Sequence, residues 1–147
     1  MITGIPVPLK KEDEEKFYEN INASKDTYSF AIETKDNSKH IGGCGIGFVD
    51  WKNRFADVGI YIGDEQYRGK GYGTDAMKIL LQFVFSEMNL NKVRLSVFDF
   101  NQRGIKSYVK CGFKQEGIKR QEMFREGRYH DVIMMGILRP EWERLNN

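Results

Sequence analysis

The stretch that decides the fold is IYIGDEQYRGKGYGT, residues 60–74. It begins with three apolar residues typical of a strand end and continues into a loop rich in glycine. Behind it, apolar side chains recur at helical spacing over residues 74–88. The first amides of a helix have no partner within the helix, and the helix dipole places a partial positive charge there. The stretch therefore predicts a strand, a glycine loop and a helix start that together suit a phosphate.

Upstream of this stretch, the pattern predicts an antiparallel meander. The expected elements are a short charged helix over residues 10–21, strands over 28–34, 40–50 and 56–62, and a turn at 36–39 between the first two strands. The second strand contains four glycines, and each costs about 0.5–1 kcal/mol relative to alanine in a regular element. They predict a β-bulge or a close approach of two backbones.

Downstream, the pattern changes to alternating helices and strands. The expected elements are a helix over 74–88, a strand over 93–98, a helix from Asn101 to Cys111-Gly112, strands over 113–124 and 128–138 joined at Glu126-Gly127, and a stop at Pro140. The strand–helix–strand unit predicts a parallel, right-handed crossover. We therefore expect an α+β fold with one mixed sheet: a meander, a β-α-β crossover and a C-terminal hairpin, in a single domain over residues 1–147.

Composition excludes several classes of protein. The 147 residues hold 40% apolar and 30% charged residues, which suits a globular core. No apolar run approaches the roughly 18 residues of a membrane span, and the first residues lack an export signal. Two cysteines make no disulfide framework and no metal-ligand spacing occurs, so we expect a cytoplasmic protein without a metal. The net charge of +2 is too small to indicate nucleic acid as a partner.

Positive charge is concentrated late in the chain. Residues 101–130 contain eight Lys or Arg against three Glu. The plain interpretation is a solvated surface. The alternative is a region that binds an anion near a phosphate-bearing ligand.

Other phosphate motifs fit the glycine loop less well. A P-loop needs a hydroxyl residue after Gly69-Lys70, but Gly71 stands there. The run from Gly71 to Ala76 matches the dinucleotide fingerprint G-x-G-x-x-A, although the strands before it are expected to be antiparallel. A glycine turn that serves only the tight entry into the helix stays open as a purely structural alternative.

Two blocks of the chain carry a family resemblance. The spacing Arg68-x-x-Gly71-x-Gly73 resembles the acyl-CoA loop of the GNAT superfamily of N-acetyltransferases. A second block, Asn101 followed by Tyr108 and then Cys111-Gly112-Phe113, is similar to another segment of that family. Later residues are similar to the branches that acetylate ribosomal-protein N-termini and polyamines; they are Glu116-Gly117, Gly127-x-Tyr129-x-Asp131 and Trp142. The resemblance covers roughly residues 28–142.

The resemblance implies a site for acetyl-CoA between two splayed strands. The residues implied to hold this co-substrate are Ile60, Tyr61, Ile62, Arg68, Gly69, Lys70, Gly71, Tyr72, Gly73, Thr74 and Asn101. The first three would pair through their backbones with the acetyl and pantetheine amides, and the loop amides would hold the pyrophosphate. Asn101 also fits a plain helix N-cap, and the two roles can coexist.

The implied reaction is direct attack of a neutral primary amine on the thioester. A backbone N–H near Ile62 is the candidate for oxyanion stabilisation. Tyr108 is the candidate general acid, and it helps chiefly by hydrogen-bonding the sulfur, because a phenol with a pKa of about 10 is a weaker acid than a thiol near 8.5. An ordinary buried aromatic is the structural alternative for Tyr108.

The general base is less clearly marked. Asp57 and Glu122 are the carboxylates of first interest, each of which also fits a solvated surface role. In some relatives a glutamate stands on the strand that holds Glu122, and the nearest position by spacing is Met123. His130, between Tyr129 and Asp131, is a further candidate. An α-amine with a pKa near 7.7 is neutral in roughly one molecule of six at pH 7, so a protein N-terminus needs little help from a base.

The chain departs from the family at its front. Relatives usually begin with a strand and a helix before the segment that matches residues 10–21, and we expect both to be absent here. A downstream start, a partner chain or a reduced acceptor site would each account for this departure. An uncovered sheet edge favours a homodimer.

The leading function is an acetyl-CoA-dependent N-acetyltransferase acting on a protein N-terminus or small amine; the alternative is a non-catalytic acyl-CoA-binding module.

Overall fold

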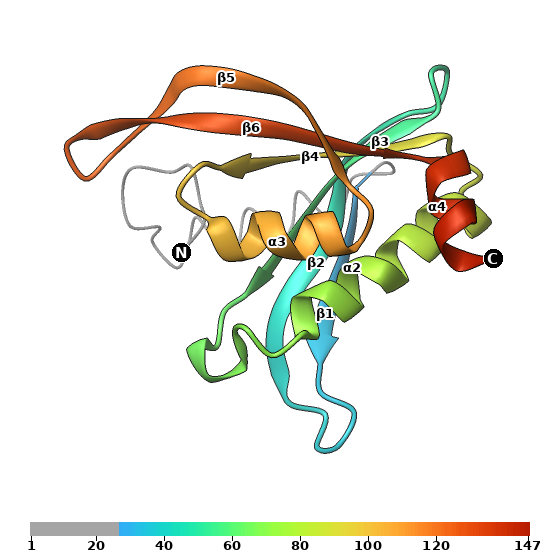
Figure 1. Cartoon of the computed structure of the whole chain (residues 1–147). Coiled ribbons are helices and arrows are strands. Elements are labelled where there is room, and N and C mark those ends of the chain that lie inside the picture. Colours follow the sequence, from blue (N-terminus) through green and yellow to red (C-terminus); the bar gives the residue numbers. More distant parts are fainter. Residues whose placement is uncertain (1–26) are drawn as a thin grey trace.

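The computed structural model describes residues 27–147, so the helix expected over residues 10–21 and the expected lack of a strand and helix before it lie outside the described part of the chain. Within this part, six strands form one mixed sheet in the order β1-β2-β3-β4-β6-β5 (Figure 1). The strands are β1 (Tyr28–Glu33), β2 (His40–Asp50), β3 (Phe55–Ile62), β4 (Lys92–Phe98), β5 (Lys114–Arg125) and β6 (Arg128–Leu138). The expected α+β class, meander and hairpin are confirmed.

The helical elements differ from expectation at their ends. They are the 3₁₀ turn η1 (Glu65–Tyr67), α2 (Tyr72–Gln82), the π-helical turn η2 (Phe83–Glu87), α3 (Gln102–Lys110) and α4 (Arg139–Asn146). The helix expected from residue 74 begins two residues earlier, because Gly71 adopts a φ of 91° and turns the loop directly into it. Pro140 ends β6 as predicted, but it also stands in the first turn of α4, where its missing N–H costs nothing. No helix in the described range is both long and apolar enough to cross a membrane.

The glycines of β2 let neighbouring strands approach closely. A Cβ placed on Gly42 would lie 2.1 Å from the Tyr61 carbonyl oxygen, and one on Gly45 would lie 2.4 Å from the Tyr28 carbonyl oxygen. The register of β2 against β3 also shifts between Ile46 and Phe48, so the strand carries a bulge at Gly47. The predicted bulge and the predicted close approach are therefore both present.

The sheet is forked between β3 and β4. These parallel strands pair over only three positions, the last of which joins Asp57 to Arg94. Beyond this pair β4 continues along β6 alone, from Leu95 to Phe98. The bulge in β2 lies opposite the same point of β3, because Val58 and Asp57 face Ile46 and Phe48 across it. A bulge increases local strand twist, which is consistent with β3 turning away from β4 there.

An ion pair lies at the point where β3 and β4 separate. Arg94 donates from Nε and Nη2 to the two carboxylate oxygens of Asp57 at 2.6 and 2.9 Å, and its guanidinium lies 3.9 Å from the ring centroid of Phe55. The flanking residues Val58 and Leu95 are buried in the core. Because side chains alternate across a strand, the ion pair lies on the opposite face of the sheet from that core.

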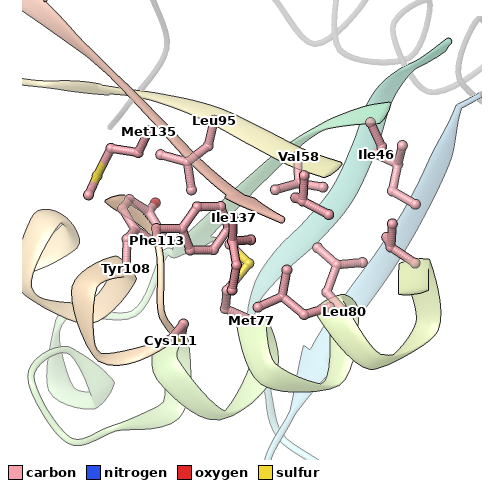
Figure 2. Packing of buried hydrophobic residues seen from close by; sticks show 14 of the residues in the cluster. Ile46, Val58, Met77, Leu80, Leu95, Tyr108, Cys111, Phe113, Met135 and Ile137 are labelled. Atoms are coloured by element: carbon pink, nitrogen blue, oxygen red, sulfur yellow. The ribbon is translucent and has the colours of Figure 1, made fainter. Parts of the chain in front are cut away.

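The hydrophobic core fills the space between the sheet and the helices. Figure 2 shows Met77 and Leu80 of α2, and Tyr108 of α3, directed toward side chains of the sheet. Trp142 of α4 packs against Phe85 with ring centroids 5.2 Å apart. Thus α2 and α3 cover one face of the sheet beside the fork (Figure 1).

A pair of glycine variants tests the close approach of β2 and β3. Gly42→Ala places its methyl group against the Tyr61 backbone, and we expect a loss of about 1–3 kcal/mol in the free energy of unfolding, typical of overpacking. Gly59→Ala in β3 meets nothing within 4 Å, so a neutral effect or a gain of about 0.4–1 kcal/mol is expected from reduced unfolded-state entropy. Urea unfolding measures both, and equal changes would contradict the close approach.

Candidate active site

The fork opens into a cleft of about 1060 Å³. One lip is β3 with the loop that follows it, and the other is β4 with the first turns of α3. The lining residues from the two lips are Val58 to Gly63, Tyr67 to Gly69, Gly71, Gly73, Thr74, Leu95 to Phe98, Phe100, Asn101, Arg103, Gly104, Ser107, Tyr108 and Arg125. A second pocket of about 250 Å³ contains the Asp57–Arg94 pair and shares Val58, Leu95 and Ser96 with the cleft.

The β3 lip presents backbone groups from alternate residues. Gly63 donates to the Ile41 carbonyl at 2.8 Å, and the Tyr61 carbonyl lies close to Gly42, so both residues direct their backbone toward β2. Backbone direction alternates along a strand, so Ile60 and Ile62 direct theirs toward the cleft. Of the three residues expected to pair through their backbones, Tyr61 thus directs its backbone toward β2, although it is among the residues that line the cleft.

The glycine loop is shaped to leave amides open. Gly69 and Gly71 adopt φ values of 71° and 91°, which are readily accessible only to glycine. The first intrahelical bond of α2 runs from the Asp75 N–H to the Gly71 carbonyl at 3.0 Å. The amides of residues 72–74 precede it and have no acceptor within the helix. This arrangement fits a phosphate-bearing ligand.

The Arg68 side chain contacts other groups of the protein. Its Nε donates to the Ile62 carbonyl at 2.9 Å, its Nη2 lies 3.4 Å from the Gly63 carbonyl, and its Nη1 lies 3.6 Å from Glu65. The guanidinium therefore braces the end of β3 against the loop. Lys70, the other cation expected near a phosphate, is exposed and does not line the cleft.

On the other lip, Asn101 caps a helix at the edge of the cleft. Its Oδ1 accepts a hydrogen bond from the Gly104 N–H at 3.0 Å and caps α3, while the residue also lines the cleft. A Cβ on Gly104 would lie 2.6 Å from the Asn101 Nδ2, so the cap requires a glycine there. Ser107 then joins the lips, because its Oγ lies 2.7 Å from the Thr74 Oγ1 of α2.

Tyr108 lies inside the cleft with its ring in the core. The side chain is 8% exposed and packs edge-on against Phe113. No hydrogen bond within residues 27–147 engages its hydroxyl, yet no fully buried polar side-chain atom in that range is left unpaired. The hydroxyl therefore reaches the open space of the cleft. Burial raises the pKa of Tyr108 to about 12, so the phenol stays protonated near neutral pH.

The structure does not bring the expected bases into this cleft. Asp57 is paired with Arg94 in the neighbouring pocket. Glu122 is exposed, where β5 bulges between Lys119 and Met123. Among the described residues, no Asp or Glu lines the cleft.

His130, on the interior strand β6, is held outside the cleft. Its Nδ1 lies 3.2 Å from the Asp99 Oδ1, and its ring packs edge-on against Phe100 at 4.8 Å between centroids. Phe100 lines the cleft and His130 does not.

Several residues that line the cleft were not identified by the sequence motifs. Arg103, Ser107, Phe98, Phe100 and Arg125 come from elements that only the fold brings to the cleft. The excess of positive charge over residues 101–130 is a signal for two of them. Of its eight cations, Arg103 and Arg125 line the cleft.

Comparison with known proteins gives consistent matches. The acetyltransferase (GNAT) domain family matches residues 1–114. A prophage-derived uncharacterized N-acetyltransferase, YokL of Bacillus subtilis, is 35% identical over 120 residues, which are 81% of this chain and 66% of that protein. The spermidine N(1)-acetyltransferase of Escherichia coli K12 is 37% identical over 94 residues, which are 64% of this chain and 50% of that protein. The chain thus spans two thirds or less of these curated relatives.

Solved structures agree with this result. A spermidine N-acetyltransferase from Vibrio cholerae, in complex with CoA and spermine, superposes with a TM-score of 0.87. It is 26% identical, and the match covers 95% of this chain and 82% of that one.

The burial of Tyr108 predicts a specific pH dependence of stability. Below pH 10 the phenol is protonated in both the folded and the unfolded states, and it adds no pH dependence. Between pH 10 and about 12 the unfolded state loses the proton while the folded state keeps it. The free energy of unfolding therefore falls as pH rises through this window, by about 2–3 kcal/mol in total.

The measurement is urea unfolding against pH for the wild type and Tyr108→Phe, with Tyr129→Phe as the matched loss of an exposed phenol. Parallel curves for wild type and Tyr108→Phe would contradict the assignment.

Proposed function

The chain belongs to the acetyltransferase (GNAT) domain family, and from this premise we propose that it transfers the acetyl group of acetyl-CoA to a primary amine. The observation that carries the proposal is the fork between β3 and β4, which opens a cleft between a loop with free amides and the Tyr108 hydroxyl. The complex of the Vibrio cholerae spermidine N-acetyltransferase with CoA and spermine supports the same pair of substrates.

Residues of both lips fit acetyl-CoA. The backbones of Ile60 and Ile62 face the cleft and would pair with the amides of the pantetheine arm as a neighbouring strand would. Gly69 to Thr74 would hold the diphosphate through their N–H groups, each worth about 1.5–3 kcal/mol as a charge-assisted bond. Asn101 would meet the arm from the opposite lip.

The thioester belongs at the closed end of the fork. With the diphosphate at the loop beyond Ile62, the pantetheine arm runs back along β3 toward Val58. The Ile60 N–H lies nearer this end than that of Ile62 and is our preferred donor to the oxyanion that forms on the carbonyl oxygen. The Ile62 carbonyl is already engaged by Arg68.

The reaction is a direct displacement. The lone pair of the neutral amine forms the new C–N bond, the C–S bond breaks with its electrons on sulfur, and the amine proton leaves to water. Full proton transfer from Tyr108, with a pKa of about 12, to a thiolate of pKa near 8.5 is uphill by about 5 kcal/mol. Tyr108 therefore acts by donating a hydrogen bond to the sulfur as charge develops.

The described lining of the cleft favours an acceptor that needs little help from a base. No carboxylate from the described residues lines the cleft, and Asp57 is neutralised by Arg94. An α-amine is already neutral in roughly one molecule of six at pH 7 and needs only a path for its proton to reach water. A peptide N-terminus is our first candidate acceptor. A polyamine is the second, favoured by the spermine in the Vibrio cholerae relative.

The test is thiol release from acetyl-CoA in the presence of amines. Peptides with a free N-terminus, polyamines and amino sugars are mixed with the protein and acetyl-CoA, and free thiol is followed against time. We expect release that depends on the amine, and none above hydrolysis with the same peptides N-terminally blocked. Binding of acetyl-CoA without release across the panel would select the non-catalytic acyl-CoA-binding module.

Removing the Tyr108 hydroxyl tests the role of this residue. Tyr108→Phe keeps the ring packing and removes only the donor to sulfur, so kcat should fall by about 10²–10³-fold, the usual cost of removing one donor to a developing negative charge. The KM for acetyl-CoA should change little. Tyr129→Phe is the matched control and should keep wild-type turnover. Unchanged turnover in Tyr108→Phe would remove the residue from the mechanism.

A further inference from the structure

One cation of the cleft has no partner in the described part of the protein. Arg103 lines the cleft, yet it forms no ion pair or side-chain hydrogen bond with any residue in 27–147. The other arginines of the cleft are engaged. Arg68 braces the end of β3, and Arg125 stacks on Phe100 at 5.2 Å.

The Arg103 side chain crosses from one lip to the other. The residue belongs to the first turn of α3, but its Cδ lies 4.0 Å from the position of a Cβ on Gly69, in the loop before α2. The Arg103 side chain thus reaches the glycine loop, whose open amides lie at the start of α2.

The place of this cation in α3 is unfavourable without an anion. The positive end of a helix dipole disfavours a cation in the first turn, by about 0.3–1 kcal/mol at an exposed site. The first turn of α3 contains no acidic residue to offset this cost. A bound phosphate would supply the missing negative charge to both the helix end and the guanidinium.

We propose that Arg103 binds the diphosphate of the nucleotide carrier from the α3 side, opposite the amides of the glycine loop. The inference rests on the proposed function and assigns the side-chain cation of the phosphate site to Arg103 in place of Arg68. A planar guanidinium can grip two phosphate oxygens at once, whereas the loop amides bind the other side of the group. The diphosphate is then held between the two lips.

The experiment compares three carriers on purified full-length protein. Calorimetry gives the Kd of CoA and of dephospho-CoA, and steady-state kinetics give the KM of acetyl-pantetheine, which lacks the nucleotide. Arg103→Gln should raise the Kd of CoA and of dephospho-CoA about 10- to 100-fold, which corresponds to the loss of charge-assisted hydrogen bonds. The KM of acetyl-pantetheine should stay within twofold of wild type.

Two further variants sharpen the result. Lys106→Gln removes an equal charge one turn further along α3, outside the lining of the cleft, and should leave each Kd near wild type. Arg103→Lys keeps the charge and should recover part of the lost affinity. Unchanged CoA binding in Arg103→Gln would overturn the proposal, as would an equal loss with acetyl-pantetheine. A penalty that vanishes with dephospho-CoA would also overturn it, because the bound group would then be the 3′-phosphate.

The binding measurements separate this inference from the proposed function. A wild-type protein that binds CoA but releases no thiol with any amine would refute acetyl transfer, and the comparison of Kd values would still decide the role of Arg103. A folded wild-type protein that binds no CoA would refute both.

Discussion

The rest of the structure depends on the shortness of one hydrogen-bonded ladder. β3 and β4 pair at three positions, from Phe55–Lys92 to Asp57–Arg94, and then separate. Backbone N–H and C=O groups are strong hydrogen-bonding groups that the interior of a sheet normally satisfies. Because the ladder stops, the backbone of Ile60 and the N–H of Ile62 stay directed at the cleft, while the Ile62 carbonyl accepts from Arg68. The cleft therefore results from the way the two strands pair, and the side chains around it determine its shape and charge.

The open groups are held in place by contacts outside the cleft. Close packing at Gly42 ties the Tyr61 backbone to β2, and Arg68 secures the end of β3 to the loop. Across the cleft, the hydrogen bond between Thr74 and Ser107 joins α2 to α3, and Asn101 fixes the start of α3. These bonds lie at the lips and leave the space between them free. The site is thus preorganised at its edges.

The sequence carries the architecture because its signals are local. Periodicity and turn residues locate the strands to within a residue or two, and the glycines of β2 indicate the bulge without knowledge of its partner. Residues 60–74 and the Asn101–Phe113 block mark the two lips, since both depend on backbone conformations that glycine or a capping residue makes possible. The short polar helix α4 has too few apolar positions to produce a periodic signal, and it was not predicted.

The contacts of individual side chains are harder to predict from the sequence, because they depend on which helices and strands pack together. Arg68 lies in the phosphate motif, yet its guanidinium turns back to Ile62. Asp57 is a candidate base by its place on β3, yet pleating puts its carboxylate on the other face of the sheet against Arg94. Arg103 comes close to Gly69 only through the packing of α3 beside α2. Each outcome follows from tertiary contacts that no spacing rule contains.

The forked sheet has a consequence for stability. Within the sheet, the half made of β1, β2 and β3 is joined to the half made of β4, β6 and β5 by three backbone pairs and one ion pair, so the shared core beneath the sheet carries most of the connection between them. In the proposed complex, an amide-bearing arm would pair with backbone groups of β3 that the sheet leaves unpaired. The arm would then take the place of an additional strand between β3 and β4, and its binding would raise the free energy of unfolding.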